Sequence, residues 1–412
     1  MNIGDKNRLF IVNKNSEEKW TFFILENSIY YKTSNKDLSI IEEKLVEDVK
    51  SFDIGLDTEE NIHIVFVTNG GELGYLHHIN KAWTRKILKK FNPSSNSIDF
   101  VNIIVFDKYV HIFYSFKNII NNNLFKTIHL YNNSLKWTYS HLDLIPQIKD
   151  SDPYFIDYDT NGNIYFLYKK PTSKNINFYL RIFSSKKNNW KAPTKLQLSQ
   201  NLHDVKLFFV DSKSNYHLFF VSNKIPSNLY HISKTSNNTT TSPSLILSQN
   251  SESLNHKVFE CNNKIWVLWK NTDNISYKSS PDLGINWEET KTLALDNLNN
   301  IDFIGFKHRS KNIIKSISTF GYLKDDDLYL LGLDNLDDYN KKPVENLELA
   351  KESPETHQLL NHDSNNDIFE ASEIESIESD NKKTNNEEQV YEEHIPEDKS
   401  FINKIIDFLS MK

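Results

Sequence analysis

The sequence is poor in cysteine, glycine and methionine, and each scarcity excludes a class of structure or site. Of 412 residues, only 1 is Cys, 10 are Gly and 2 are Met. The lone Cys261 cannot form an internal disulfide, so the fold needs no oxidising compartment. A glycine-rich phosphate loop, a G-x-S-x-G elbow and a C-x-x-C pair are all absent. With so little glycine, we expect asparagine to occupy many turn positions.

Long apolar runs are also missing. No stretch approaches the roughly 20 apolar residues of a membrane helix. The opening segment MNIGDKNRLFIVNKN has no apolar core of the length that a signal peptide requires. We therefore expect no integral membrane segment and a cytoplasmic location, with non-classical association with a cell or spore surface as the alternative.

Charge is concentrated in one acidic segment and is otherwise balanced. Residues 340–400 hold 17 Asp or Glu against 6 Lys, whereas the whole chain carries a net charge of -7. The rest is therefore close to neutral and lacks the clustered Lys and Arg that nucleic acid binding requires. Residues 336–398 are rich in Asn, Ser and Glu and show no strand or helix periodicity, which predicts a disordered acidic linker.

A repeat of about fifty residues fills the remainder of the chain. Three segments align: DTEENIHIVF from Asp57, DTNGNIYFLY from Asp159 and DSKSNYHLFF from Asp211. We expect the three aspartates to open hairpin turns by accepting hydrogen bonds from backbone amides. The aromatic residue that closes this segment recurs about every 50 residues, at Phe66, Tyr114, Tyr168, Phe220 and Trp269. A second marker recurs at Trp83, Trp137, Trp190 and Trp287.

Each repeat contains four short segments with the composition of strands. In the unit that begins near residue 49 these segments are 51–57, 61–67, 72–78 and 83–89. The second segment of each unit is apolar on both faces, so both faces of its sheet must be covered. Four-stranded units with a period of about 40 to 50 residues are typical of β-propellers, whose blades cover one another.

The predicted fold is an all-β propeller of seven four-stranded antiparallel blades. Complete units begin near 49, 98, 153, 203 and 254, and partial units lie at 8–46 and 301–333. Six blades result if the two partial units share one blade. The predicted domains are the propeller at 1–335, the linker at 336–398 and an amphipathic helix at 399–412.

The segment ISYKSSPDLGINW, from Ile275, contains Ser280, Asp282, Gly284 and Trp287 in the pattern S-x-D-x-G-x-x-W. This pattern resembles the Asp-box of the sialidase-like (BNR) propeller proteins. Physically, Asp282 can cap the amides of a hairpin turn and Gly284 can adopt a positive φ. In that family the box is structural, so the resemblance implies architecture and no reaction.

Sialidase chemistry itself is not predicted. The family's enzymes clamp a substrate carboxylate with three arginines, one of them in an R-I-P type motif. This chain has no R-I-P sequence and four arginines, Arg8, Arg85, Arg181 and Arg309. Because a fold does not confer chemistry, we name no catalytic residue and favour a protein without enzymatic activity.

Two patterns resemble metal sites. His63, His111 and His217 share one repeat position, but Tyr165 and Trp266 fill it in other units, which favours packing over ligation. The segment Asp157, Asp159, Asn161 and Gly162 spells D-x-D-x-N-G, like the start of a calcium loop, but its twelfth position is Tyr168 instead of Glu. We favour an Asx-type turn there, with calcium as the alternative, and predict no other metal or cofactor.

The C-terminal segment PEDKSFINKIIDFLSMK predicts a short amphipathic helix. Ser400 is a candidate N-cap. The apolar stripe comprises Phe401, Ile402, Ile405, Ile406, Phe408 and Leu409. Twelve residues are too few for a stable isolated helix, so we expect it to fold against a partner groove. Packing on its own propeller and lying on a membrane surface are the alternatives.

Three functions are compatible with these features. The preferred hypothesis is a non-catalytic scaffold that binds a protein partner through a propeller face and the tethered helix. The second is a carbohydrate-binding or glycoside-hydrolase-like propeller, suggested by the Asp-box and by aromatic side chains available for stacking on sugars. The third is a structural protein of a cell or spore envelope.

Overall fold

The computed structural model describes most residues between Leu9 and Leu330. The gaps within this range are 15–17, 35–39, 119–122, 134–135, 149–151, 173–175, 197, 199–203, 222–227, 235–244, 249–254, 271–273, 295–301, 309–316 and 325–326. The chain divides into two units, Met1–Val344 and Glu345–Lys412, and all described residues belong to the first. The predicted linker at 336–398 and the helix at 399–412, with its stripe from Phe401 to Leu409, lie outside the described residues.

The described residues form strands and turns, with no helix among them. Four antiparallel sheets have four strands each, in an up-and-down order. The first holds β5 (Val49–Leu56), β6 (Ile62–Thr68), β7 (Glu72–Ile79) and β8 (Ala82–Lys90). The second holds β9 (Asn96–Phe106), β10 (Tyr109–Asn118), β11 (Leu124–Asn132) and β12 (Trp137–Pro146). The others hold β18 (Asp204–Val210), β19 (Tyr216–Val221), β20 (Leu229–Lys234) and β21 (Leu245–Ser248), and β22 (Asn255–Cys261), β23 (Lys264–Lys270), β24 (Asn274–Ser280) and β25 (Lys291–Ala294).

Two further sheets depart from this plan. In one, β13 (Tyr154–Tyr158), β14 (Ile164–Pro171) and β15 (Ile176–Ser184) are followed by two short segments, β16 (Asn189–Trp190) and β17 (Thr194–Lys195), which both pair with β15. The other has seven strands in the order β28-β27-β26-β1-β2-β3-β4. Its strands are β1 (Leu9–Lys14), β2 (Glu18–Leu25), β3 (Ser28–Ser34), β4 (Ile40–Val46), β26 (Asp302–His308), β27 (Ile317–Lys324) and β28 (Asp327–Leu330). Its two halves join through a parallel pair in which Leu9 lies opposite Ile304.

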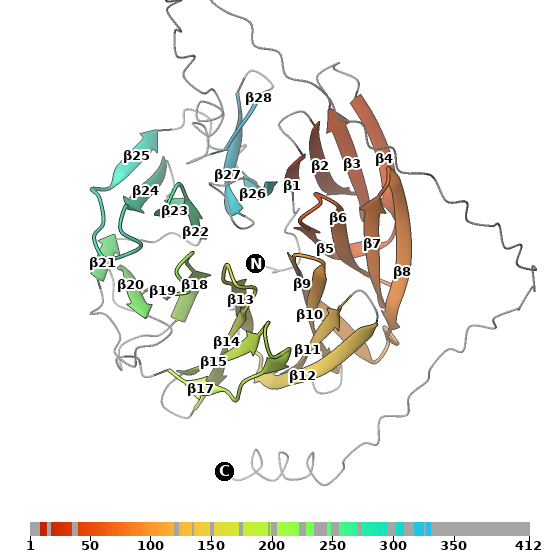
Figure 1. The fold of residues 1–412 in the computed structure, drawn as a ribbon, viewed down its shortest axis with the longest axis horizontal. Coiled ribbons are helices and arrows are strands. Elements are labelled where there is room, and N and C mark those ends of the chain that lie inside the picture. Colours follow the sequence, from red (N-terminus) through yellow and green to blue (C-terminus); the bar gives the residue numbers. More distant parts are fainter. Residues whose placement is uncertain are drawn as a thin grey trace, which may run out of the picture. The chain divides into compact units, whose positions relative to one another are not determined.

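The sheets of this unit stand around a common centre, as in a β-propeller. The first strand of each sheet, such as β5, β9, β13, β18 and β22, is the innermost one, and neighbouring sheets meet face to face (Figure 1). No helix among the described residues is long and apolar enough to cross a membrane. The predicted all-β architecture of four-stranded antiparallel sheets is thereby confirmed.

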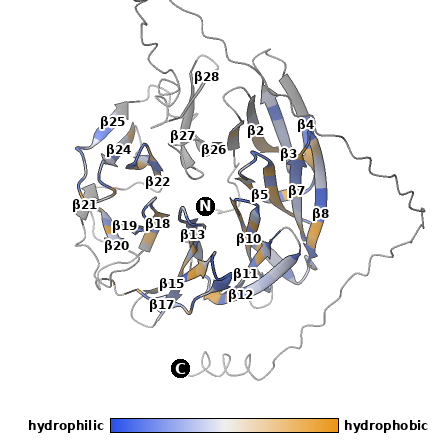
Figure 2. Cartoon of the chain, viewed as in Figure 1, coloured by the Kyte–Doolittle hydropathy of each residue, from blue (hydrophilic) through white to orange (hydrophobic). Residues whose placement is uncertain are grey.

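Burial is greatest on the second strand of the sheet formed by β5 to β8 and least on its outer strand. Every residue of β6 (IHIVFVT) is buried, whereas β8 at the edge (AWTRKILKK) contains no buried residue. Figure 2 shows the corresponding apolar colouring of the middle strands. A strand that is apolar on both faces must be covered on both faces, and the two neighbouring sheets provide that cover.

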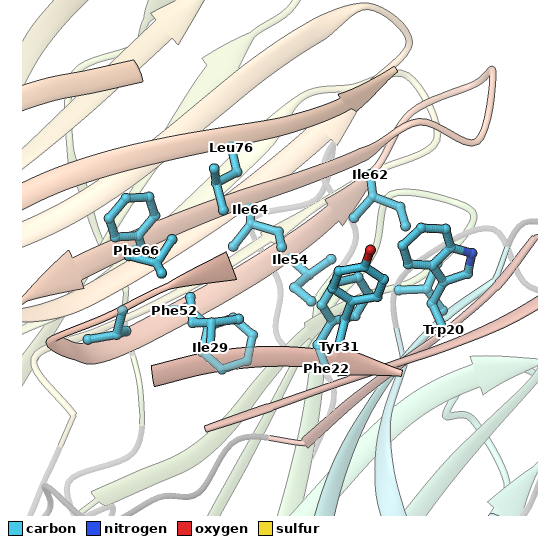
Figure 3. Packing of buried hydrophobic residues seen from close by; sticks show 13 residues of the cluster. Trp20, Phe22, Ile29, Tyr31, Phe52, Ile54, Ile62, Ile64, Phe66 and Leu76 are labelled. Carbon is cyan, nitrogen blue, oxygen red and sulfur yellow. The ribbon is translucent and has the colours of Figure 1, made fainter. Parts of the chain in front are cut away.

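Side chains from adjacent sheets interdigitate in the layer between them. Figure 3 shows one such layer, where Trp20 and Phe22 of β2 meet Ile54 of β5 and Ile64 of β6. Both isoleucines are fully buried. At about 25 cal/mol per Å² of apolar surface removed from water, such layers supply most of the stabilisation of the unit.

Asparagine replaces glycine in the tight turns, as the composition predicts. Positive φ angles occur at Asn27, Asn80, Asn188 and the pair Asn262 and Asn263. Asn tolerates this left-handed conformation better than other residues with a side chain. The hairpins therefore form although the chain has only 10 glycines.

One glycine is needed for packing inside a strand. Gly74 of β7 lies opposite Phe66 of β6, and a Cβ at Gly74 would come within 2.0 Å of the Phe66 ring. Arg85 in turn lies over this ring, 5.4 Å from its centroid. The phenyl ring thus covers the space that a side chain at position 74 would need.

We predict that Gly74→Ala lowers the free energy of unfolding by about 1–3 kcal/mol, because the Phe66 ring must leave its position. Gly70→Ala is the matched control, since the nearest atom to a Cβ there is 3.4 Å away. The control is expected to change stability by at most about 0.5 kcal/mol. Chemical denaturation of both variants measures the difference, and equal stabilities would contradict this view of the packing.

Candidate functional site

Three aspartates at the turn between the first and second strands make the same hydrogen bonds. Oδ1 of Asp57 accepts from the amides of Glu59 and Asn61, at 2.8 Å each. Oδ1 of Asp159 accepts from two amides at 2.9 Å, and Oδ1 of Asp211 from two amides at 3.0 and 2.7 Å. In each turn the asparagine four residues on also donates its side-chain amide to Oδ2. These are Asx-type turns in which a carboxylate binds backbone donors.

The same Oδ2 atom contacts a polar ring on the second strand. His63 Nε2 lies 3.2 Å from Asp57 Oδ2, and His217 Nε2 lies 3.2 Å from Asp211 Oδ2. The Tyr165 hydroxyl donates to Asp159 Oδ2, also at 3.2 Å. Burial alone would raise the pKa of Asp57, but the hydrogen bonds from His63 and Asn61 outweigh it and lower that pKa to about 2.

A further polar contact connects the second strand to the third. His63 Nδ1 lies 2.6 Å from the Tyr75 hydroxyl. In the next sheet His111 Nδ1 lies 3.0 Å from His129 Nε2, and in a later one His217 Nδ1 lies 3.0 Å from His231 Nε2. We call these sets the polar lines: Asp57, His63 and Tyr75; His111 and His129; Asp211, His217 and His231.

One tryptophan fixes which nitrogens donate and which accept in the polar line of His111 and His129. Trp190 Nε1, which can only donate, lies 3.0 Å from His129 Nδ1. His129 must then carry its proton on Nε2 and donate it to His111 Nδ1, so both rings are neutral. Burial lowers the pKa of His111 to about 3, and burial together with His111 holds the pKa of His129 well below its usual value.

Each of the repeating tryptophans packs against side chains of the preceding sheet. Trp190 packs edge-on against Phe113 and His129, with ring centroids 6.2 and 5.4 Å apart. Trp287 packs in the same way on Phe219 and His231, at 6.2 and 5.2 Å. The other two contacts of this kind are Trp83 on Phe22 and Tyr31, and Trp137 on Tyr75. We call this repeated contact the tryptophan joint.

One cluster of potential metal ligands occurs among the described residues. Asp57, His63 and His77 each offer a ligand atom, and these atoms lie within 4.8 Å of one another. The rings of His63 and His77 are stacked, with centroids 4.3 Å apart. Burial, and then the nearby His63, lowers the pKa of His77 to about 4, so this ring is neutral at pH 7. His78, on the other face of β7, packs against Trp20 and Trp83 instead.

The turn that resembles a calcium loop directs its carboxylates at amide donors. Oδ2 of Asp157 accepts from the amide of Val210 in the next sheet at 2.6 Å, and Oδ1 accepts from Tyr158 at 2.8 Å. Asp159 holds the Asx-type turn described above. Asn161 contributes an amide to that turn, and Gly162 adopts a φ of 73°. Tyr168, the twelfth position, is buried and stacks on Tyr179.

The Asp-box segment forms a compact turn. Ser280 Oγ donates to Asp282 Oδ1 at 2.9 Å and accepts from the Gly284 amide at 2.7 Å. Asp282 also accepts from the backbone and side chain of Asn286, both at 2.7 Å. Gly284 has a φ of 90°, and a Cβ there would come within about 3 Å of His217 and His231. The turn therefore lies directly against the polar line of the preceding sheet.

The two described arginines do not converge. Arg85 pairs with Glu72 in one sheet, at 3.4 Å, whereas Arg181 donates to the Leu142 and Lys191 carbonyls in another region. Arg8 and Arg309 lie outside the described residues. The docking residues Phe401, Ile402, Ile405, Ile406, Phe408 and Leu409 do so as well. Within the described ranges, no arginine clamp of the sialidase type is assembled.

No protein-family model and no curated protein sequence match this chain. Solved structures do resemble it. A polysaccharide lyase of a new family, an ulvan lyase bound to -[GlcA(1-4)Rha3S]-, matches with a TM-score of 0.50 and 12% identity, over 79% of this chain and 93% of the lyase. The polysaccharide lyase Uly1 matches with a TM-score of 0.52 and 8% identity, over 79% of this chain and 88% of that one. The six-bladed β-propeller lectin of Aleuria aurantia matches at 0.41 and 12% identity, over 70% and 95%. At these identities the likeness concerns the fold, which is that of β-propeller proteins, and no specific sialidase-like architecture is shown.

The tryptophan joints yield a matched pair of variants. Trp190→Phe keeps an aromatic ring but removes the donor to the buried His129, whereas Trp287 Nε1 has no hydrogen-bond partner among the described residues. We predict that Trp190→Phe costs about 1–3 kcal/mol more stability than Trp287→Phe, because a buried acceptor is left unsatisfied. Urea denaturation of both variants tests this. Equal losses would show that the hydrogen bond contributes nothing.

The buried histidines also predict a dependence of stability on pH. The pKa values of His111, His129 and His231 in the folded state lie below the value of 6.5 that applies when these rings are exposed. The unfolded chain therefore binds more protons as the pH falls from about 6.5 towards 3, and stability decreases over this window. The urea concentration at the denaturation midpoint, measured from pH 8 to pH 4, should decrease as the pH drops below 6.5. A flat profile between pH 6.5 and pH 4 would contradict neutral buried histidines.

Proposed function

We propose that this protein is a carbohydrate-binding β-propeller. The observation that carries the proposal is the likeness to an ulvan lyase solved with a bound saccharide, which extends over 79% of this chain and 93% of the lyase. The likeness to Uly1, a second polysaccharide lyase, supports the same class of ligand. These findings favour a saccharide ligand over the protein scaffold that the sequence predicts.

Binding without cleavage is the part of the proposal that the described side chains support. The aspartates, histidines and tyrosines of the polar lines contact one another and lie between sheets, where most of them are shielded from solvent. A catalytic acid or base must reach its substrate within hydrogen-bond distance. We therefore leave the polar lines out of the proposed saccharide site.

Tyr139 is a candidate contact for a sugar ring. It lies on the outer strand β12 and is exposed, with an exposed fraction of 64%. An aromatic ring offers a flat apolar face for the C–H groups of a pyranose, while its hydroxyl remains available for a hydrogen bond. Ile285, with an exposed fraction of 70%, is equally accessible but offers no such face.

Affinity electrophoresis of the full chain in gels that contain neutral or uronic-acid polysaccharides tests the proposal. We expect retardation by at least one polysaccharide, and a loss of about tenfold in affinity for Tyr139→Ala, which corresponds to about 1.4 kcal/mol. Ile285→Ala and a truncation ending at Tyr339 should bind as the full chain does. Migration unaffected by every polysaccharide would overturn the proposal. Retention that requires residues after Tyr339 would also overturn it, because the saccharide contact would then lie outside the propeller.

We also propose that the unit has seven blades. The seven-stranded sheet divides at the parallel pair of β1 and β26 into two antiparallel groups, β1–β4 and β26–β28. Each group begins with a strand in the innermost position, as the other five sheets do, which supports two blades over one. An experimental map in which β26–β28 and β1–β4 share a single radial position would contradict this count.

A further inference from the structure

The cluster of Asp57, His63 and His77 differs from every other polar line among the described residues. The pair of Asp57 and His63 has a close counterpart in Asp211 and His217, with the same 3.2 Å contact. In β7, however, the residue directly opposite His63 is His77, whereas Ser233 lies opposite His217 and Tyr131 lies opposite His111. The first sheet therefore adds a second imidazole to a pair that otherwise serves the fold.

One ring nitrogen of His77, Nε2, is buried without a hydrogen bond in the part of the chain that the structure describes. A buried polar atom left unsatisfied costs about 1–3 kcal/mol, so such an atom needs an explanation. His77 stacks on His63 with 17° between the ring planes, and a ring nitrogen of one lies within 4.8 Å of a ring nitrogen of the other. The Asx-type turn holds the Asp57 carboxylate, whose Oδ2 lies 3.2 Å from His63 Nε2.

We propose that Asp57, His63 and His77 form a binding site for a zinc-type divalent ion. Two imidazoles and one carboxylate suit zinc and its first-row neighbours, whereas calcium requires six to eight oxygen ligands. All three ligand atoms lie within 4.8 Å of one another. Because the lone pair of an imidazole lies in the ring plane, one of the two stacked rings must rotate out of the stack for both to bind one ion. Three protein ligands leave one coordination position of a tetrahedral ion for water or another donor.

Tyr75 completes the site from outside the ligand set. The ion takes the lone pair of His63 Nε2, so the proton of the neutral ring must reside on Nδ1, which lies 2.6 Å from the Tyr75 hydroxyl. The hydroxyl oxygen then accepts this proton in a hydrogen bond. Such a bond to the second nitrogen fixes the orientation of a metal-binding histidine. Tyr75 is itself held by the tryptophan joint with Trp137, at a centroid distance of 5.5 Å.

The experiment uses the full chain, stripped with a chelator and titrated with Zn²⁺ and, separately, with Co²⁺. We expect the natural protein to bind one more equivalent of tightly held ion than His77→Gln does. The melting temperature should rise with zinc concentration for the natural protein and stay constant for His77→Gln. His141→Gln is the matched control, because His141 is an exposed histidine outside the cluster. Uptake by other histidines is common to all three proteins and cancels in the comparison.

Two results would overturn the proposal: no uptake by the natural protein, or equal uptake by natural protein and a folded His77→Gln variant. If the variant does not fold, X-ray absorption of the zinc-loaded natural protein decides. Two imidazole ligands on the tightly bound ion support the site, and fewer than two overturn it. The proposal does not depend on saccharide binding, so either result is independent of the electrophoresis described above.

Discussion

The contact on which the rest of this structure depends is the tryptophan joint. A tryptophan near the start of an outer strand, or in the turn that precedes it, lies edge-on against an aromatic pair on the sheet before it. The geometry repeats closely: Trp83, Trp190 and Trp287 each lie 6.2 Å from a phenylalanine, at interplanar angles of 84–86°. Aromatic pairs favour such edge-to-face contacts because the positive ring edge meets the negative ring face. Each joint thus sets the spacing and rotation between two neighbouring sheets.

The joints explain why histidine is buried so often in this protein. A histidine on the third strand offers the flat ring that tryptophan needs and a nitrogen that can accept a hydrogen bond. His129 uses both properties, since its Nδ1 accepts from Trp190 and its ring packs beside Phe113. These rings must remain neutral, because an isolated charge buried between two sheets would be strongly disfavoured. Polar side chains here serve to align sheets, while apolar layers supply the bulk of the stability.

Much of the fold could be predicted from sequence, because the repeat carries local signals. The expected segments 51–57, 61–67, 72–78 and 83–89 agree with β5 to β8 to within one residue, except at the first strand, which begins two residues earlier. The expected unit starts near 49, 98, 153, 203 and 254 fall close to β5, β9, β13, β18 and β22. Alternation, turn residues and period are all properties of short segments, and a sequence displays them directly.

The relations between segments were harder to predict. That Trp190 would lie on His129, 61 positions away, depends on how two sheets face each other. The closeness of His77 to Asp57 depends on the pairing register of β7 with β6, in which His77 lies opposite His63. The sequence comparison of His63 with Tyr165 and Trp266 favours packing over ligation at this position. It could not show that one sheet places a second imidazole there.

The parallel pair of β1 and β26 has a consequence for how the ring forms. Leu9 lies opposite Ile304, so this parallel pair joins two strands almost 300 residues apart in the sequence. Closing a flexible loop of that length costs about 5 kcal/mol in chain entropy if it closes in one step. Blades that assemble in order along the chain would shorten the remaining loop progressively, so this parallel pair is the last contact to form. We therefore expect the described unit to open first at this parallel pair, because that contact closes the longest loop in the chain.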